Sequence, residues 1–158
     1  MNDEATPCGA VVDADAAKRT VIVSSMASDS HTWNLVYLEL LLGELGFDVV
    51  NLGACVPDEL LLSECHEHRP DAVVLSTVNG HGHADGRRLI DRLRADETLS
   101  DLLVVIGGKL GVSGSEDTSL AAELVMAGFD AAFPDGTGLD DFITYLGAAL
   151  AIPAMESA

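Results

Sequence analysis

An aspartate and a histidine lie two residues apart in the segment SSMASDSHTWN, which spans residues 24–34. The segment follows the apolar run RTVIV and leads into LVYLELLLGELGF, so it connects a strand to a helix. Asp29 is close enough in sequence to hydrogen-bond one ring nitrogen of His31. Such a bond orients the other ring nitrogen, as in a metal-bound imidazole with its supporting carboxylate. The pair therefore predicts a metal ligand.

A single imidazole restricts the kind of metal that this loop can hold, because no other ligand-type group accompanies His31 there. One histidine with one orienting carboxylate is too little for a structural zinc site. It is enough for a metal that brings its own equatorial ligands, as a corrin or a haem does. The alternative is that His31 is an ordinary solvated loop residue.

The elements that must position this loop alternate between apolar runs of strand type and segments of helical periodicity. We expect strands at 20–25, 47–53, 71–77, 102–108 and 129–134, and helices at 32–45, 57–68, 84–97, 115–127 and 138–150. This pattern predicts an α/β fold, a single flavodoxin-like (Rossmann-like), doubly wound, five-stranded parallel sheet of order 2-1-3-4-5. The predicted domain covers 19–150, with a flexible arm at 1–18 and a tail at 151–158.

Ligands of such sheets bind beyond the carboxyl ends of the strands, where this sequence is rich in glycine. The segments STVNGHGHADG, GGKLG and FPDGTG all fall at that edge. Glycine backbone lets a flat group approach the sheet closely, and Ser76 would place a hydroxyl in the same groove. The edge therefore predicts a groove for something large and flat. Trp33 is either a wall of this groove or part of the core.

The remaining histidines and the cysteines indicate no further metal site. His66 and His68 stand at the end of a predicted helix, whose negative pole favours them. His81 and His83 lie nearer the predicted site and are candidates for contacts with a ligand or a partner. The three cysteines form no CxxC pair, which argues against a disulfide framework or a zinc site, and we expect Cys55 and Cys65 to be buried or semi-buried.

Composition excludes several classes of partner. The formal net charge is −18, with 26 acidic and 8 basic residues, which argues against binding to nucleic acid or to an anionic membrane. No run approaches the ~20 apolar residues of a membrane span, and the start does not resemble a signal peptide, so we expect a cytoplasmic protein. The sequence has no GxSxG nucleophile elbow and lacks the acidic pair of a response-regulator receiver after its first strand.

These residues resemble the cobalamin-binding domains that hold their cofactor base-off through a histidine. The family pattern is Asp-x-His-x-x-Gly after the first strand, Ser-x-Leu after the third and Gly-Gly after the fourth. Here it reads DSHTWN from Asp29, STV from Ser76, and Gly107-Gly108. The similarity is closest to the small subunits of glutamate mutase (methylaspartate mutase), through GFDVVNLG, STVNGHG and GFDAAFPDGTG. It covers about residues 19–150.

The resemblance implies that His31 is the lower axial ligand of cobalt and that Asp29 supports it. Ser76 would meet the displaced dimethylbenzimidazole of the nucleotide tail. The cofactor-binding residues that the resemblance implies are Asp29, Ser30, His31, Thr32, Ser76, Val78, Gly80, Gly82, Gly107, Gly108, Phe133, Pro134, Gly136 and Thr137. Two positions depart from the pattern, with Asn34 in place of glycine and Val78 in place of leucine. Asn34 adds a side chain that would alter cofactor affinity or the seating of the tail.

The function that this resemblance implies is the cobalamin-binding small subunit of an adenosylcobalamin-dependent carbon-skeleton mutase, an isomerase that converts glutamate to 3-methylaspartate. The radical chemistry would take place in a separate, large TIM-barrel subunit, because 158 residues cannot hold the ~250 of such a barrel. We therefore expect the chain to be inactive alone and to form a heterotetramer with that partner. The alternatives are a cobalamin carrier or sensor, and a diverged interaction protein that has lost cobalamin.

Overall fold

The computed structural model describes residues 18–112 and 117–150. Strands and helices alternate along the chain in these residues. The order is β1 (Thr20–Ser24), α1 (Trp33–Glu44), β2 (Asp48–Asn51), α2 (Asp58–His68), β3 (Ala72–Thr77), α3 (Gly82–Ala95), β4 (Leu103–Gly108), α4 (Asp117–Ala127), β5 (Ala131–Pro134) and α5 (Leu139–Ala149).

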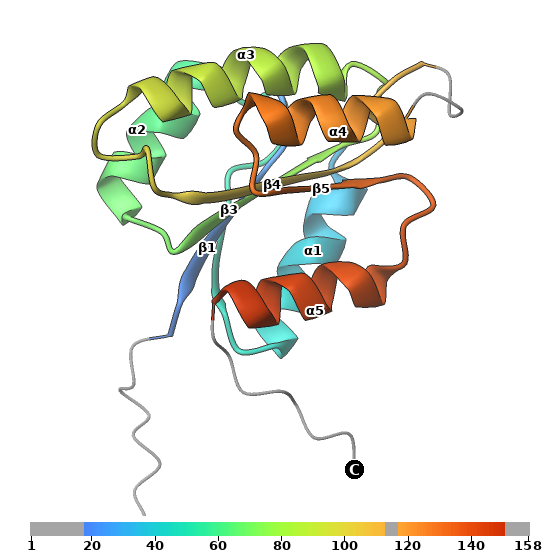
Figure 1. The fold of residues 1–158 in the computed structure, drawn as a ribbon. Coiled ribbons are helices and arrows are strands. Elements are labelled where there is room, and N and C mark those ends of the chain that lie inside the picture. Colours follow the sequence, from blue (N-terminus) through green and yellow to red (C-terminus); the bar gives the residue numbers. More distant parts are fainter. Residues whose placement is uncertain (1–17, 113–116, 151–158) are drawn as a thin grey trace, which may run out of the picture.

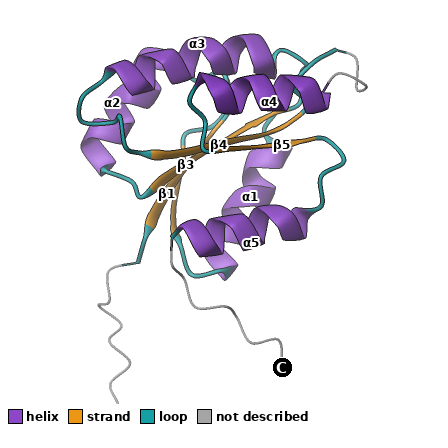
Figure 2. Cartoon of the chain, in the orientation of Figure 1, coloured by secondary structure: helices purple, strands orange, loops and turns teal. Residues whose placement is uncertain are grey.

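The five strands form one parallel sheet of order β2-β1-β3-β4-β5, which confirms the predicted topology (Figure 2). Helices α2, α3 and α4 cover one face of the sheet, and α1 and α5 cover the other (Figure 1). The strand order reverses between β1 and β3, so the loops after these two strands diverge to opposite faces. This is the switch point at which such sheets bind ligands.

Alternate residues of the central strands supply two separate cores. Leu75 and Ile106 pack under α2, α3 and α4, whereas Val74 and Val105 pack under α1 and α5. All six residues of β3 are buried, which explains why its sequence is continuously apolar from Ala72 to Leu75 rather than alternating. The sheet is thus a rigid support for the loops that leave its carboxyl edge.

The observed bounds agree with the predicted ones to within two residues at every described end, those of the short strand β2 included. The clearest difference is α3, which begins at Gly82 instead of residue 84. A Cβ at Gly82 would overlap the Thr77 side chain, so the absence of a side chain lets this first turn pack directly on β3. Residues 115–116 of the predicted fourth helix, and nearly all of the predicted arm and tail, lie outside the described residues.

The register of the sheet places several residues of the predicted site next to one another on adjacent strands. Ser76 is opposite Gly107, and Gly107 is opposite Phe133, at the carboxyl ends of β3, β4 and β5. Gly108 has a φ of +102°, and a Cβ there would overlap the carbonyl oxygen of Thr77. Only glycine therefore fits this close approach of two strands. Within the described residues, no helix is long and apolar enough to cross a membrane.

Candidate functional site

Asp29 is the centre of a hydrogen-bond network at the switch point. Its carboxylate is completely buried and accepts four hydrogen bonds. One oxygen accepts from the backbone N–H of His31 at 3.0 Å and from its ring Nδ1 at 2.7 Å. The other accepts from Thr77 Oγ1 at 3.0 Å and from the backbone N–H of Val78 at 2.8 Å. The carboxylate thus joins the loop after β1 to the end of β3.

These bonds keep Asp29 ionised in spite of its burial. Burial by itself raises the pKa of this carboxyl group. The hydrogen bonds from the backbone of Val78, from the backbone and ring of His31, and from the Thr77 hydroxyl outweigh it, so the pKa falls from 3.8 to about 2. The group is therefore a fixed negative charge at neutral pH.

His31 presents one ring nitrogen to the outside of this network. Because a carboxylate only accepts hydrogen bonds, Nδ1 carries the donated proton and Nε2 of the neutral ring keeps its lone pair. The side chain is 49% exposed, so a ligand can reach this nitrogen. The hydrogen bond predicted from the spacing of Asp29 and His31 is present, and it leaves the ring suited to bind a metal.

A second network holds the same loop against the helices of the opposite layer. The Ser28 hydroxyl hydrogen-bonds to the carboxylate of Asp85 at the start of α3, and Asn79 donates to Ser28. Asp85 also accepts from Arg88, whose guanidinium reaches the buried carboxylate of Asp58 on α2. The loop that carries His31 is therefore supported from β3, α3 and α2.

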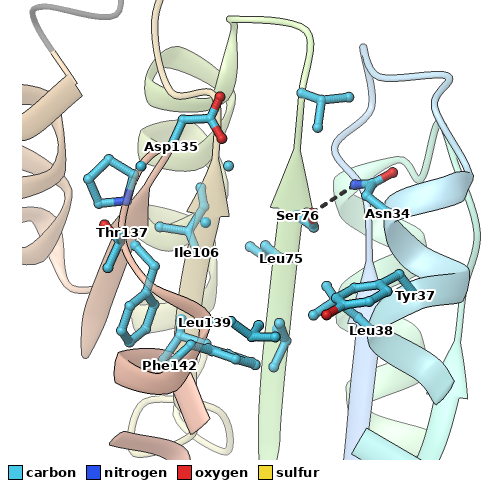
Figure 3. Close-up of a pocket in the computed structure, with 18 of the residues that line it drawn as sticks. Asn34, Tyr37, Leu38, Leu75, Ser76, Ile106, Asp135, Thr137, Leu139 and Phe142 are labelled. Atoms are coloured by element: carbon cyan, nitrogen blue, oxygen red, sulfur yellow. Dashed lines mark hydrogen bonds between the residues drawn. The ribbon is translucent and has the colours of Figure 1, made fainter. Parts of the chain in front are cut away.

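A pocket of about 260 Å³ opens beside the loop, between α1 and the β5–α5 segment over the ends of β3 and β4. Figure 3 shows Asn34 and Tyr37 of α1 on one side of Ser76, and Leu139 and Phe142 of α5 on the other. Its lining residues are Trp33, Asn34, Tyr37, Leu38, Val74, Leu75, Ser76, Val78, Val105, Ile106, Gly107, Gly108, Phe133, Pro134, Asp135, Gly136, Thr137, Gly138, Leu139 and Phe142. Most of these are apolar, which suits a flat ring rather than a charged group.

The pocket brings together more than half of the residues predicted for the site. Ser76, Val78, Gly107, Gly108, Phe133, Pro134, Gly136 and Thr137 all line it. Asp29, Ser30, His31 and Thr32 lie in the adjoining loop just before α1. Gly80 and Gly82 do not line the pocket: a Cβ at Gly80 would contact the segment around Gly111, and Gly82 packs on β3.

Several wall residues were not predicted from the sequence. Tyr37 and Leu38 follow Trp33 and Asn34 by one helical turn, so this spacing is a signal that could have identified them. Phe142 was hidden in the apolar pattern of α5, although its ring packs edge-on to Phe133 at 5.4 Å between centroids. Trp33 is 65% exposed, so it is a wall of the pocket mouth and not a core residue.

Asn34 occupies the position where the cobalamin-binding pattern has glycine. Its side chain is directed inward, and Nδ2 donates to Ser76 Oγ at 2.7 Å (Figure 3). Both residues are buried and both line the pocket. Asn34 Oδ1 is buried and has no hydrogen-bond partner among the described residues. The departure from the family pattern thus adds an amide to the pocket wall without closing the pocket.

Three of the four other histidines lie beside a carboxylate. His66 pairs with Asp96 at 2.7 Å, His68 with Glu64 at 2.9 Å and His83 with Glu123 at 2.7 Å. Within residues 18–112 and 117–150, no group of three or more His, Cys, Asp or Glu side chains is placed to hold a metal ion.

The two described cysteines differ in exposure. Cys65 is buried as expected, but the prediction for Cys55 is wrong. Cys55 is exposed in the turn before α2, where its φ of +52° and its N–H bond to the Asp29 carbonyl fix the backbone and leave the side chain outside.

Comparison with known proteins identifies relatives of the whole described domain. The family model for the B12-binding domain matches residues 19–139. Glutamate mutase sigma subunit 1 of Haloarcula marismortui is 32% identical over 139 residues, covering 88% of this chain and 91% of the relative. The glutamate mutase sigma subunit of Fusobacterium nucleatum is 30% identical over 127 residues, covering 80% and 93%.

Among solved structures, a cobalamin-binding protein from Desulfitobacterium hafniense has the same fold. Its TM-score is 0.68 at 23% identity, over 84% of this chain and 60% of that one. The match of the family model and the extent of the sigma-subunit similarity agree with the strand order and with the position of the Asp29–His31 pair. The chain therefore belongs to the B12-binding domain family, in which its relatives are glutamate mutase sigma subunits.

Proposed function

We propose that this chain is the cobalamin-binding small subunit of an adenosylcobalamin-dependent mutase of the glutamate to 3-methylaspartate type. The observation that carries the proposal is the orientation of His31. Asp29 accepts the hydrogen bond from Nδ1 of His31, which leaves Nε2 free on a half-exposed ring, in the loop that adjoins an apolar pocket. The similarity to sigma subunits supports the same assignment.

The residues present fit a corrinoid and fit few other metal groups. One imidazole supplies a single metal bond, so the metal has to arrive with its remaining ligands, as cobalt does in a corrin. The adjoining pocket of about 260 Å³, with its aromatic and aliphatic walls, has the character needed for the flat base that a base-off corrinoid displaces from cobalt. The side chain of Asn34 leaves that space open.

When bound, adenosylcobalamin supplies the deoxyadenosyl radical that starts a carbon-skeleton rearrangement. The residues of this chain would bind and orient that cofactor. Asp29 holds a proton on Nδ1 of His31 and so leaves Nε2, which would be the cobalt ligand, directed outward. Gly107 and Gly108, which have no side chains, would let the nucleotide tail approach β4, and Phe133 and Phe142 would exclude water from its base.

The substrate would be bound by a second chain. The relatives are named as sigma subunits of glutamate mutase, and we infer for this chain a large catalytic partner of TIM-barrel fold, in a heterotetramer. The loops after β1, β3, β4 and β5 all leave the carboxyl edge of the sheet. If the partner covers this edge, a corrin held there would lie between the two subunits.

The test is an absorbance titration with adenosylcobalamin and hydroxocobalamin. The wild-type chain should show saturable binding with a base-off, histidine-ligated spectrum. The variant His31→Ala should lose that spectrum and bind cobalamin at least about 100-fold more weakly. Loss of a residue that only supports a metal ligand costs up to about 100-fold in affinity, and loss of the ligand itself should cost at least as much. His68→Ala, at the opposite edge of the sheet, is the matched control and should bind like the wild type. Unchanged binding by His31→Ala would refute the assignment of the ligand.

A second experiment separates the mutase from a cobalamin carrier or sensor. The loaded chain should restore glutamate mutase activity to a purified large subunit from one of the relatives' organisms, and the large subunit alone should be inactive. Tight, histidine-ligated binding without any such activation, together with no complex on gel filtration, would favour the carrier or sensor.

A further inference from the structure

The loop that carries His31 is hydrogen-bonded to the end of β3 on both sides of that residue. Before His31, the Asp29 carboxylate accepts two hydrogen bonds from the end of β3 and the residue after it. After His31, Asn34 Nδ2 donates to Ser76 Oγ on β3 at 2.7 Å (Figure 3). The loop is therefore held by two side chains that bond to the same strand end.

Between these two side chains, the loop has no packing that would fix it. Residues 30–33 are all exposed, whereas Asp29 and Asn34 on either side are buried. An exposed segment of this length has few apolar contacts of its own, so its conformation depends on the residues at its two ends. The position of His31 thus depends on how well Asp29 and Asn34 are held.

The start of α1 has little local stabilisation. Thr32, at the N-cap, makes no side-chain hydrogen bond to the helix, and the first turn has no acidic residue. Leu35 packs into the core beside α1, but an apolar contact is non-directional. The hydrogen bond from Asn34 fixes the turn to one residue of β3. Nδ2 alone makes this bond, since Oδ1 has no partner among the described residues.

We infer that Asn34 is a positioning residue for the metal ligand. Its hydrogen bond to Ser76 holds the first turn of α1 on β3 and, together with the bonds of Asp29, keeps His31 in place before a cofactor arrives. A loop that is already ordered loses less conformational entropy on binding. Glycine, which the cobalamin-binding pattern has at this position, cannot make the bond. The inference rests on the proposed function, because that function makes His31 the cobalt ligand.

The test measures affinity and not activity, and its probe is hydroxocobinamide, a corrinoid without a nucleotide tail. This probe has no base for the pocket that Ser76 lines, so either partner of the hydrogen bond can be removed without disturbing a tail. The variants are Asn34→Ala, Ser76→Ala and the double variant. The matched control is Asn51→Ala, because this asparagine also joins α1 to a strand, through Glu39, but outside the pocket.

The wild-type chain should bind hydroxocobinamide with a histidine-ligated spectrum. Asn34→Ala and Ser76→Ala should each bind it about fivefold more weakly, which is the value of one hydrogen bond. The double variant should also be about fivefold weaker and not about 25-fold, because both substitutions remove the same bond. Alanine forms helices better than asparagine, so a loss in Asn34→Ala does not come from helix propensity. Asn51→Ala should bind like the wild type.

Hydrogen exchange in the cofactor-free chain separates local positioning from general stability. The backbone N–H groups of Leu35 and Val36 donate to the Thr32 carbonyl in the first turn of α1. They should exchange about fivefold faster in Asn34→Ala and Ser76→Ala, while the N–H groups of β3 exchange as in the wild type. A general loss of stability would instead accelerate exchange in β3 as well.

The outcomes keep the inference and the proposed function apart. Unchanged cobinamide binding in both single variants overturns the inference, as does unchanged exchange of the first-turn N–H groups. Tighter binding of cobalamin by Asn34→Ala also overturns it, since the amide would then obstruct the tail. A wild-type chain that binds cobalamin but not cobinamide overturns it too, because a histidine already in place needs no tail. Failure of the wild type to bind cobalamin refutes the proposed function, and the inference with it.

Discussion

The replacement of Asp29 by asparagine tests the central argument about the site. Each oxygen of the Asp29 carboxylate accepts from one backbone N–H, of His31 on one side and of Val78 on the other. An amide has only one oxygen, so in either orientation its NH₂ group faces a backbone N–H that can only donate. One buried donor is left without an acceptor, and the negative charge is lost as well.

The magnitude follows from the lowered pKa and from this unsatisfied group. The fall in the pKa of Asp29 from 3.8 to about 2 corresponds to about 2 kcal/mol in favour of the folded state at neutral pH. With the unsatisfied N–H, Asp29→Asn should lower the free energy of unfolding by about 2–4 kcal/mol at pH 7. It should also weaken cobalamin binding about 10- to 100-fold, because His31 loses the support of the carboxylate.

The pH dependence gives the sharper result. Because the pKa of Asp29 is lower in the folded chain than in the unfolded one, its contribution is complete above about pH 4 and is lost as the pH falls toward 2. The difference in unfolding free energy between wild type and Asp29→Asn should therefore narrow by about 2 kcal/mol over that interval, since all other carboxyl groups titrate in both proteins.

The assay is urea denaturation followed by circular dichroism at several pH values between 7 and 2.5. Asp91→Asn, an exposed carboxylate of α3, is the matched control and should differ from the wild type by less than about 0.5 kcal/mol at every pH. A difference for Asp29→Asn that is below 0.5 kcal/mol at pH 7, or that is constant down to pH 2.5, would show that the buried hydrogen bonds do not hold the carboxylate ionised.

Three further predictions concern the framework around the site. Gly108→Ala should lower the free energy of unfolding by more than about 2 kcal/mol, because the new Cβ would overlap a carbonyl oxygen of β3. Its control is Gly147→Ala on α5, which has nothing within 4 Å of the new Cβ and should raise that free energy by about 0.5–1 kcal/mol. Equal effects of the two substitutions in urea denaturation would contradict this prediction. Arg88→Met should lower the free energy of unfolding by about 1–2 kcal/mol in the same assay, since two largely buried carboxylates, on α2 and α3, lose their half-exposed cation. No loss would mean that the ion pairs of Arg88 make no net contribution to stability. Burial raises the pKa of the Cys65 thiol to about 12, so at pH 8 iodoacetamide should alkylate exposed Cys55 in the native chain and Cys65 only after denaturation. Peptide mass mapping identifies the alkylated residue, and labelling of Cys65 in the native chain would disprove its burial.

Much of the fold could be predicted because the central strands are buried on both faces. The continuous apolar runs around Val73 and Val104, separated by helical periodicity, fit few arrangements other than a doubly wound parallel sheet. The exact start of α3 could not be predicted, since glycine is typical of loops and only the close contact of Gly82 with Thr77 explains its place in the first helical turn. The exposure of Cys55 likewise depends on a positive φ that its residue type does not suggest.

The sequence by itself indicated the pairing of Asp29 with His31, because a spacing of two residues lets a carboxylate reach an imidazole within one loop. The bonds from Thr77 and Val78 that fix the carboxylate come from the tertiary structure. The carboxyl-edge position of the pair also followed from the order of apolar runs. Only the tertiary structure decided what encloses the pocket, since its walls come from α1, the ends of β3 and β4, and α5, which are far apart in the chain. It also decided the role of Asn34, whose amide acquires a partner only when α1 packs on β3 and brings Ser76 within 2.7 Å.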